Sequence, residues 1–303
     1  MPIISLYKIV ALPPMQLLPL ATIGFSPAQL HFLKTVIEDQ KGTGIFDTRV
    51  YKEKVMSASV VNPPKALVDL CFSPDFEAQH PECIGMLICM TTTPESLPKL
   101  ELAPVNKGEA LTHFATQVGV PLHRILTMGD GGHNTGNDRH LLAQGTLAYH
   151  VGHTTPQHDG AIDTKQLFDS TGPKASAKVI RSLMETRPLL MDAAAFDYDS
   201  TIGEDRGTIT QEMVTLLIDL MHLVPVAIIT GSSFTTFTTK CARLIGALSQ
   251  KPGLVDRFHV YTYHGCGHAI LSSSSEPMSP DLPTPTRSTL GPGFTFSTGS
   301  RSR

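Results

Sequence analysis

The chain has 303 residues and a formal net charge of −3, and no basic stripe runs along it. This balance argues against nucleic acid as the main partner, because such proteins cluster lysine and arginine on one face. A hydrophobic content of 41% is ordinary for a globular protein. The length suits two domains, or one core with a cap.

The cysteines and the N-terminal segment bear on where the protein works. The five cysteines are odd in number and form no Cys-x-x-Cys pair, so we expect buried free thiols in a reducing compartment. The apolar run 9–23 is interrupted by Pro13, Pro14 and Pro19, whereas a membrane helix needs ~20 uninterrupted apolar residues. The prolines also argue against a signal peptide. We therefore expect a soluble, cytoplasmic protein without a membrane partner.

Residues 1–104 are expected to form an α/β cap. Ser26 followed by Pro27 is typical of a helix start, and this helix should run to about Lys41. Residues 51–61 alternate between apolar and polar side chains, which predicts a strand of an antiparallel sheet. Two further strands of that sheet are predicted at Ile84–Met90 and Leu100–Ala103.

Residues 105–188 are expected to form one half of an α/β core. The predicted order is helix, strand, acidic loop, helix, strand and, after a polar linker, a final helix. The segments with clear bounds are the helix Lys107–Val118, the strand Ile125–Met128, the strand Ala148–Val151 and the helix Pro173–Glu185.

Residues 189–271 restart the α/β pattern as a second half-core. The apolar run Leu189–Ala195 predicts a buried parallel strand, and Thr208-x-x-Gln211 predicts a capping box at the next helix. Further elements are predicted at Val224–Ile229, Phe234–Leu248 and Phe258–Tyr263. Residues 272–303 are mostly Ser, Pro, Thr and Gly, so we expect a disordered tail.

Two carboxylates one residue apart, Asp197 and Asp199, follow the predicted strand 189–195. Ligands of open α/β sheets collect at the carboxyl ends of parallel strands. One carboxylate there can attack phosphorus or hold a metal ion, and the other can carry a proton. The simpler alternative is that both aspartates only stabilise a strand-to-loop turn, where aspartate is common.

Phosphate or metal ligands are predicted at three other places. Thr230-Gly231 follows the strand 224–229, and a hydroxyl beside backbone amides suits a phosphate, although a plain turn would have the same residues. Lys107 is predicted to be a surface charge that neutralises phosphate, or else an ordinary exposed lysine. Asp130 and Asp138 lie in a glycine-rich loop, which could also be a simple surface loop.

Together these segments resemble the four motifs of the haloacid-dehalogenase-like (HAD) phosphatases. The similarity assigns Asp197–Thr201 to motif I, Thr230 to motif II, Lys107 to motif III, and Asp130 with Asn137-Asp138 to motif IV. The sequence around these motifs is most similar to that of the sugar-phosphatase and phosphomannomutase-like branch, whose members carry a large α/β cap. The resemblance covers about residues 100–270 and implies a Rossmann-like parallel sheet with a mixed α/β cap.

The resemblance also implies a role for each motif residue. Asp197 would be the nucleophile that forms an aspartyl phosphate, and Asp199 would protonate the leaving oxygen and later activate water. The implied phosphate ligands are Thr230, Gly231 and Lys107. Mg²⁺ is the implied cofactor, because hard oxygen ligands suit it. The implied metal site draws on Asp197, Asp199, Asp130 and Asp138.

Two features depart from that family. Motifs III and IV precede motifs I and II. The chain therefore resembles the C-terminal part of one HAD module followed by the N-terminal part of another, or a circular permutant of a single module. The two halves could close into one core, complete each other in a homodimer, or belong to a fragment of a tandem protein. Ser200 stands where the family usually has glycine, and this position often needs unusual backbone angles.

The leading interpretation is a Mg²⁺-dependent phosphatase that hydrolyses a small phosphorylated metabolite, such as a sugar phosphate. One alternative is a catalytically inactive HAD-like module that binds a phosphometabolite or a protein partner. Another is a phosphosugar mutase. Ser200 and the motif order favour the inactive module, whereas retention of every charged motif residue favours the enzyme.

Overall fold

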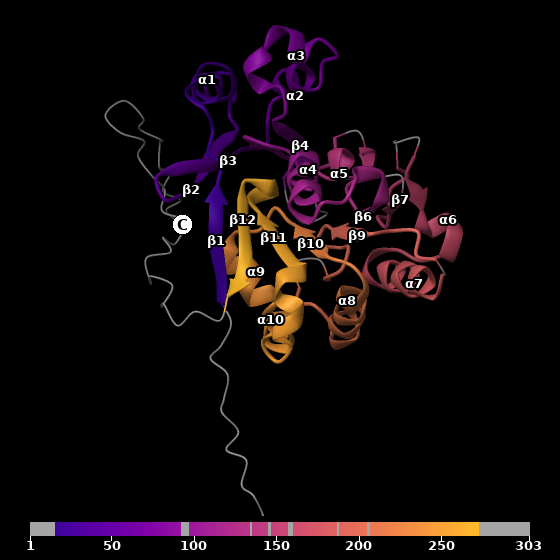
Figure 1. Cartoon of the computed structure of the whole chain (residues 1–303). Helices are drawn as coiled ribbons and strands as arrows, with labels where there is room; N and C mark the ends of the chain where they lie inside the picture. Colours follow the sequence, from indigo (N-terminus) through magenta and orange to yellow (C-terminus); the bar gives the residue numbers. More distant parts are fainter. Residues whose placement is uncertain are drawn as a thin grey trace, which may run out of the picture.

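The computed structural model describes residues 16–91, 97–133, 135–144, 147–156, 160–186, 188–204 and 207–272. The predicted disordered tail therefore lies, beyond Ser272, outside the described residues. Where it is described, the chain is α/β as predicted, with a large, mostly parallel sheet and a smaller antiparallel sheet (Figure 1). All five cysteines are buried and free, also as predicted. No helix within the described ranges is both long enough and apolar enough to cross a membrane.

The large sheet has eight strands in the spatial order β1-β12-β11-β10-β9-β6-β7-β8. The strands are β1 (Gln16–Thr22), β12 (Gly267–Ser272), β11 (Phe258–Thr262), β10 (Val226–Ile229), β9 (Ala193–Phe196), β6 (Ile125–Gly129), β7 (Leu147–His150) and β8 (Ile162–Asp163). The strands from β11 to β8 run parallel to one another, whereas β12 is antiparallel to β11 and β1 is antiparallel to β12.

Helices cover both faces of the large sheet, because its central strands are apolar on both sides (Figure 1). Successive side chains of a strand point to opposite faces. Ala195 and Ala227 accordingly belong to the core under α4 (Lys107–Val118) and α5 (Arg139–Ala143). Phe196 and Ile228 belong to the larger core on the opposite face. The helices of that face are α7 (Gly172–Glu185), α8 (Gln211–Leu223), α9 (Phe234–Lys240) and α10 (Ala242–Ser249).

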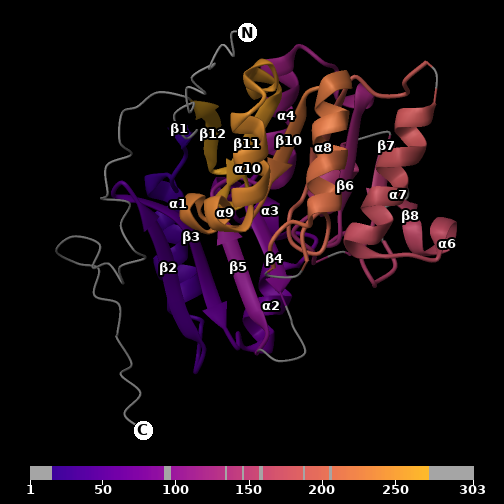
Figure 2. The same ribbon diagram turned by 90° about the horizontal axis from the view of Figure 1, so that it is seen from below.

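The smaller sheet has four antiparallel strands in the order β2-β3-β5-β4 (Figure 2). They are β2 (Ile45–Tyr51), β3 (Lys54–Val61), β5 (Lys99–Ala103) and β4 (Leu87–Thr91). One face packs on the helical segments α1 (Pro27–Phe32), η1 (Leu33–Glu38), α2 (Lys65–Cys71) and α3 (Phe76–Gln79). Residues of the other face, such as Met56 and Leu87, belong to the core of the large sheet, so the two sheets share one apolar interior.

Short elements complete the described part of the chain. They are η2 (Pro81–Cys83), η3 (Leu122–Arg124), α6 (Thr164–Phe168), η4 (Pro252–Arg257) and η5 (Tyr263–Gly265). The backbone amide of Met90 donates to the carbonyl of Thr135 at 2.8 Å, and that of Ile23 donates to Cys266 at 2.7 Å. The first hydrogen bond ties strand β4 of the smaller sheet to the loop after β6, and the second continues the pairing of β1 with β12.

The two predicted half-cores pair with each other within one chain. Strand β6 lies parallel beside β9, with Ile125 opposite Ala193 and Met128 opposite Phe196. This is the first of the three arrangements that the motif order allowed. Because parallel strands end at the same edge of a sheet, the pairing brings the carboxyl ends of β6, β9 and β10 together.

The N-terminal region differs from the prediction in two respects. Strand β1 does not belong to the smaller sheet but pairs with β12 at the edge of the large one, so residues 1–104 are not all cap. The single strand predicted over 51–61 is instead the second half of a hairpin, β2–β3. Lys52 and Glu53 form its turn with φ of 46° and 65°, a two-residue geometry that matches the twist of paired strands.

The helices of the second half also differ locally from the prediction. The N-cap of α8 is Thr210 rather than Thr208, and its hydroxyl accepts a hydrogen bond from the amide of Met213 at 3.2 Å. The helix predicted over 234–248 is two helices, α9 and α10, that meet at Cys241, which is buried.

Candidate functional site

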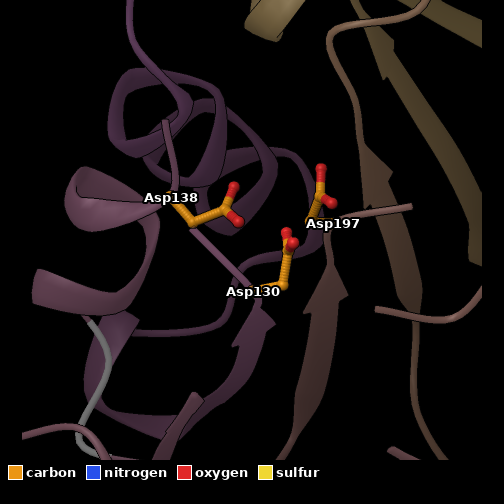
Figure 3. A group of neighbouring side chains, drawn as sticks. All are labelled: Asp130, Asp138 and Asp197. Carbon is orange, nitrogen blue, oxygen red and sulfur yellow. The ribbon is translucent and has the colours of Figure 1, made fainter. Parts of the chain in front are cut away.

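Three carboxylates meet at the carboxyl edge of the large sheet (Figure 3). Asp130 directly follows β6, Asp197 directly follows β9, and Asp138 is the N-cap residue of α5. One oxygen of each lies within 4.8 Å of one oxygen of the other two, and this is the single such acidic group in the described part of the chain. The structure therefore brings Asp197 together with Asp138 and Asp130, which precede it in the sequence by 59 and 67 positions.

Lys107 lies inside this acidic cluster and not on the surface, so the prediction of a surface charge is wrong. Its side chain is 0% exposed. The ammonium donates to Oδ1 of Asp197 at 2.5 Å and to Oδ1 of Asp138. Lys107 is the first residue of α4, whose N-cap Asn106 accepts from the amides of Gly108 and Glu109 and so fixes the helix start beside the carboxylates.

Asp138 is completely buried and is held by two donors. One oxygen accepts from Lys107 and the other accepts from the backbone amide of Gly131 at 2.8 Å. A Cβ atom at Gly129 would lie 2.7 Å from the Asp138 carboxyl group, so only glycine allows this approach. Burial alone would raise the pKa of Asp138, but Lys107 and the Gly131 amide hold that pKa below its ordinary value.

The other two carboxyl groups have raised pKa values. Burial, together with repulsion from Asp138, raises the pKa of Asp197 to about 7 against the opposing effect of Lys107. Burial and the charges of Asp138 and Asp197 raise the pKa of Asp130 well above its ordinary value. One ammonium thus does not balance three crowded carboxylates. Oxygen ligands at this spacing suit a hard divalent cation such as Mg²⁺, which would relieve the repulsion.

Asp199 does not join the acidic cluster through its side chain. Its carboxylate accepts from the ammonium of Lys240 at 2.5 Å, and the side chain is 34% exposed. Lys240 ends α9 and also lies over the ring of Tyr198. The sequence pattern did not point to Lys240, since a lysine in the last turn of a helix has a sufficient explanation in the helix dipole.

The loop after Asp197 has unusual backbone angles at Ser200, as the sequence analysis expects for this position. Ser200 has a φ of 56°, in the left-handed region that costs a non-glycine residue about 1–2 kcal/mol. The loop is held by the buried Tyr198, whose hydroxyl donates to the carbonyl of Gly207 at 3.2 Å. A Cβ atom at Gly203 would lie 2.6 Å from the Tyr198 ring, so glycine is needed there too.

Thr230 and Gly231 lie at the same edge, directly after β10. Thr230 is buried, and its hydroxyl accepts from the amide of Ser232 at 3.1 Å, so the side chain closes its own turn. Its carbonyl accepts from the amide of His264 at 2.8 Å. The imidazole of His264 packs directly on Gly231, because a Cβ atom at that glycine would lie 2.5 Å from the ring carbon Cε1.

The smaller sheet reaches this turn with two charged residues that sequence reasoning did not select. The guanidinium of Arg49 on β2 donates to the carbonyl of Gly231 at 3.4 Å. Glu101 on β5 accepts from Lys99 at 2.5 Å, and its second oxygen lies 3.9 Å from Nε2 of His264. No local motif marks these residues, because they reach the turn only through the contact between the two sheets.

The sequence-predicted residues thus lie at three places in the structure. Asp130, Asp138, Asp197 and Lys107 form one cluster, in which Asp130 is half-buried and the other three are buried. The Thr230–Gly231 turn lies at the same sheet edge, and the carboxylate of Asp199 is paired with Lys240. Comparison of the chain with protein-family models, curated proteins and solved structures finds no match, so the chemistry of these residues carries the functional conclusion.

Proposed function

We propose that this protein is a Mg²⁺-dependent phosphatase of the HAD type that acts on a small phosphorylated metabolite. The observation that carries the proposal is the buried cluster of three carboxylates and one lysine at the carboxyl edge of a parallel sheet. A structural role alone would not explain it, since like charges buried together cost stability unless a function retains them.

Asp197 is the proposed nucleophile. Lys107 holds its Oδ1, so Oδ2 is the oxygen that would attack phosphorus. A bond forms between this oxygen and phosphorus, the ester bond breaks, and the leaving oxygen takes a proton from Asp199. Water then loses a proton to Asp199 and attacks the aspartyl phosphate, which releases inorganic phosphate and restores Asp197.

The remaining residues of the edge would bind and position the phosphoryl group. Asp130 and Asp197 would hold Mg²⁺, with Asp138 beside them, and the bound ion would neutralise charge on the phosphoryl oxygens. The turn amides after Thr230 would donate to a phosphoryl oxygen. Lys107 keeps Asp138 and Asp197 in place through its two ion pairs.

An inactive phosphate-binding module is the second candidate, and one observation favours it. The carboxylate of Asp199 is paired with Lys240, so the proposed proton donor is engaged by another side chain. Ser200 adds local backbone strain next to it. In this alternative the acidic cluster would still bind Mg²⁺ and a phosphate ester, but the ester bond would not break.

Two measurements on the full chain distinguish the candidates. Phosphate release from a panel of phosphomonoesters, with Mg²⁺ or with EDTA, should show activity that requires the metal. Thermal unfolding should show that Mg²⁺ stabilises the protein by about 2.7 kcal/mol at a concentration 100 times its Kd. Stabilisation without turnover would favour the binding module, and the absence of both would refute the proposed metal site.

A further inference from the structure

His150 lies next to the acidic cluster although it belongs to none of the four sequence motifs. It is the last residue of β7, and β7 is parallel to β6, which ends directly before Asp130. The residue is completely buried, and Nε2 of its ring lies 2.9 Å from the backbone carbonyl oxygen of Asp130. Because a carbonyl oxygen can only accept, Nε2 carries the hydrogen and donates it. The ring therefore binds the backbone of a proposed metal ligand and not its carboxylate.

The backbone on both sides of the Asp130 Cα atom is held by the end of β7. The carbonyl of Gly129, which precedes Asp130, accepts from the amide of Val151 at 3.0 Å. The carbonyl of Asp130 itself accepts from the ring of His150. Peptide groups are planar, so the two that flank a Cα atom together set the direction of its Cα–Cβ bond. His150 and Val151 thus fix the direction in which the side chain of Asp130 leaves the backbone.

The peptide group between Asp130 and Gly131 is also bonded at its other end. The amide of Gly131 donates to Oδ2 of Asp138 at 2.8 Å. One peptide group therefore links the two side chains, with the ring of His150 on its oxygen and the carboxylate of Asp138 on its hydrogen. Hydrogen bonds in such a chain strengthen one another, because each polarises the next. His150 accordingly acts on two carboxylates of the acidic cluster through the same peptide group.

The space around the imidazole is shaped for this hydrogen bond. A Cβ atom at Gly152 would lie 2.2 Å from the carbonyl oxygen of Asp130 and 2.8 Å from Nε2 of His150. A Cβ atom at Gly132 would lie 2.6 Å from Cδ2 of the same ring. A larger residue at either position would therefore displace the ring from the carbonyl. Among the residues that the structure describes, the other ring nitrogen, Nδ1, has no hydrogen-bond partner.

We propose that His150 is a positioning residue of the metal site, which directs the carboxylate of Asp130 and aligns the amide that holds Asp138. Burying a ring with an unpaired nitrogen costs stability, whereas an apolar side chain would fill the same space without that cost. The hydrogen bond to Asp130 explains why a histidine stands here. Groups that orient metal ligands from behind change metal affinity when they are lost. This inference rests on the proposed function, because it assumes that the acidic cluster binds Mg²⁺.

Calorimetry of Mg²⁺ binding to the metal-free full chain tests the proposal. His150→Leu removes the donor and keeps a buried side chain, so the Kd for Mg²⁺ should rise roughly 10- to 100-fold. His150→Gln should restore most of the affinity, because its amide nitrogen reaches the position of Nε2 and can donate. His150→Asn carries the same amide on a side chain that is one carbon shorter, so it should bind Mg²⁺ as weakly as His150→Leu.

A second ion separates positioning from a general loss of structure. Mg²⁺ demands near-ideal octahedral geometry, whereas Ca²⁺ accepts flexible geometry. His150→Leu should therefore raise the Kd for Mg²⁺ by a larger factor than the Kd for Ca²⁺. His268→Leu is the matched control: it removes another buried histidine, on β12 and outside the acidic cluster, and should leave both Kd values unchanged. If His150→Leu does not fold, the comparison of His150→Gln with His150→Asn decides.

The inference and the proposed function fail in different ways. Equal Mg²⁺ affinity in the wild type and His150→Leu, or in His150→Gln and His150→Asn, would overturn the inference and leave the proposed phosphatase unaffected. A loss of the same factor for Mg²⁺ and Ca²⁺ would also overturn it. If the wild type binds Mg²⁺ but hydrolyses no phosphomonoester, the enzymatic proposal fails, while a Kd that rises in His150→Leu and recovers in His150→Gln still supports the inference. A wild-type chain that does not bind Mg²⁺ would overturn both.

Discussion

Two clusters of titratable side chains lie on the large sheet, and burial acts on their buried members in different ways. The acidic cluster consists of Asp130, Asp138 and Asp197 with Lys107 at the carboxyl edge. The histidine cluster lies where α4, β11 and β12 meet and consists of His113, His259, His268 and Tyr261. Both clusters are made by residues far apart in sequence, so their difference comes from chemistry and not from topology.

In the histidine cluster, burial lowers the pKa values of His259 and His268 and so favours their neutral rings. The ring of His268 stacks on Tyr261 with centroids 4.6 Å apart, and His113 contacts the Tyr261 hydroxyl at 2.9 Å. Burial, with the neighbouring rings of His259 and His113, lowers the pKa of His268 to about 4. Neutral stacked rings need no counter-ion. In the acidic cluster, burial and mutual repulsion raise the pKa values of Asp130 and Asp197, and a bound cation would relieve that repulsion, whereas neutral histidine rings offer no such reason to bind a cation.

The largest expected effect is the loss of turnover in Asp197→Asn, because an amide cannot form the aspartyl phosphate. We expect kcat to fall by at least about 10⁴-fold, as for other enzymes that lose their nucleophile. Asp199→Asn should lower kcat by about 10²- to 10⁴-fold, which is the usual contribution of acid–base catalysis. Phosphate release measures both, with Asp192→Asn, a surface aspartate paired with Arg124, as the matched control. Activity that survives Asp197→Asn would refute the mechanism.

The next largest effect concerns the stability of the acidic cluster. Lys107→Ala should lower the free energy of unfolding by about 3–5 kcal/mol, because it leaves buried carboxylates without their partner. Lys65→Ala is the matched control: its ion pair with Asp69 is also local to a helix start, but the lysine is 86% exposed, so the change should be below about 0.5 kcal/mol. Urea unfolding without metal measures both. A loss below 1 kcal/mol for Lys107→Ala would show that the cluster is already largely neutral.

The histidine cluster predicts a loss of stability in acid. The pKa of His268 is lower in the folded chain than in the unfolded chain, so unfolded protein binds a proton first as the pH falls. The stabilisation by neutral His268 is therefore present above about pH 6.5 and is lost as the pH falls towards 4. His268→Phe should reduce the loss of unfolding free energy between pH 7 and pH 4 by up to about 3 kcal/mol. The same pH series on His31→Gln, an exposed histidine of α1, should match the wild type, and equal slopes for all three proteins would contradict the prediction.

The smallest effect is expected at Ser200. Ser200→Gly removes the cost of the left-handed backbone, about 1–2 kcal/mol, but adds flexibility to the unfolded chain, about 0.5–1 kcal/mol. The net change should be a stabilisation of about 1 kcal/mol or less, measured by thermal unfolding. A clear destabilisation would mean that the serine side chain makes a contribution beyond its backbone angle.

Local signals predicted much of the fold and part of the site. The helix Lys107–Val118 has the predicted bounds, because Asn106 caps its start and Gly119 ends it with a φ of 68°. The strand ends before Asp130 and Asp197 were also predictable, since short apolar runs followed by polar residues mark buried parallel strands. Their convergence follows from the rule that parallel strands end at one edge of a sheet.

Contacts between distant segments decided the rest. Gln16 pairs with Ser272 at the edge of the large sheet, and nothing in either segment marks the other as its partner. The burial of Lys107 depends on α4 lying against α5 and the end of β9, so its sequence position alone indicates an ordinary helix-start lysine. His264 and Glu101 likewise meet only because the smaller sheet packs beside the strained turn after β11. The sequence by itself determined which side chains end the strands, through local hydrophobic patterning. Only the tertiary structure decided which of them are buried together, because strand pairing and burial depend on segments that are remote in the chain.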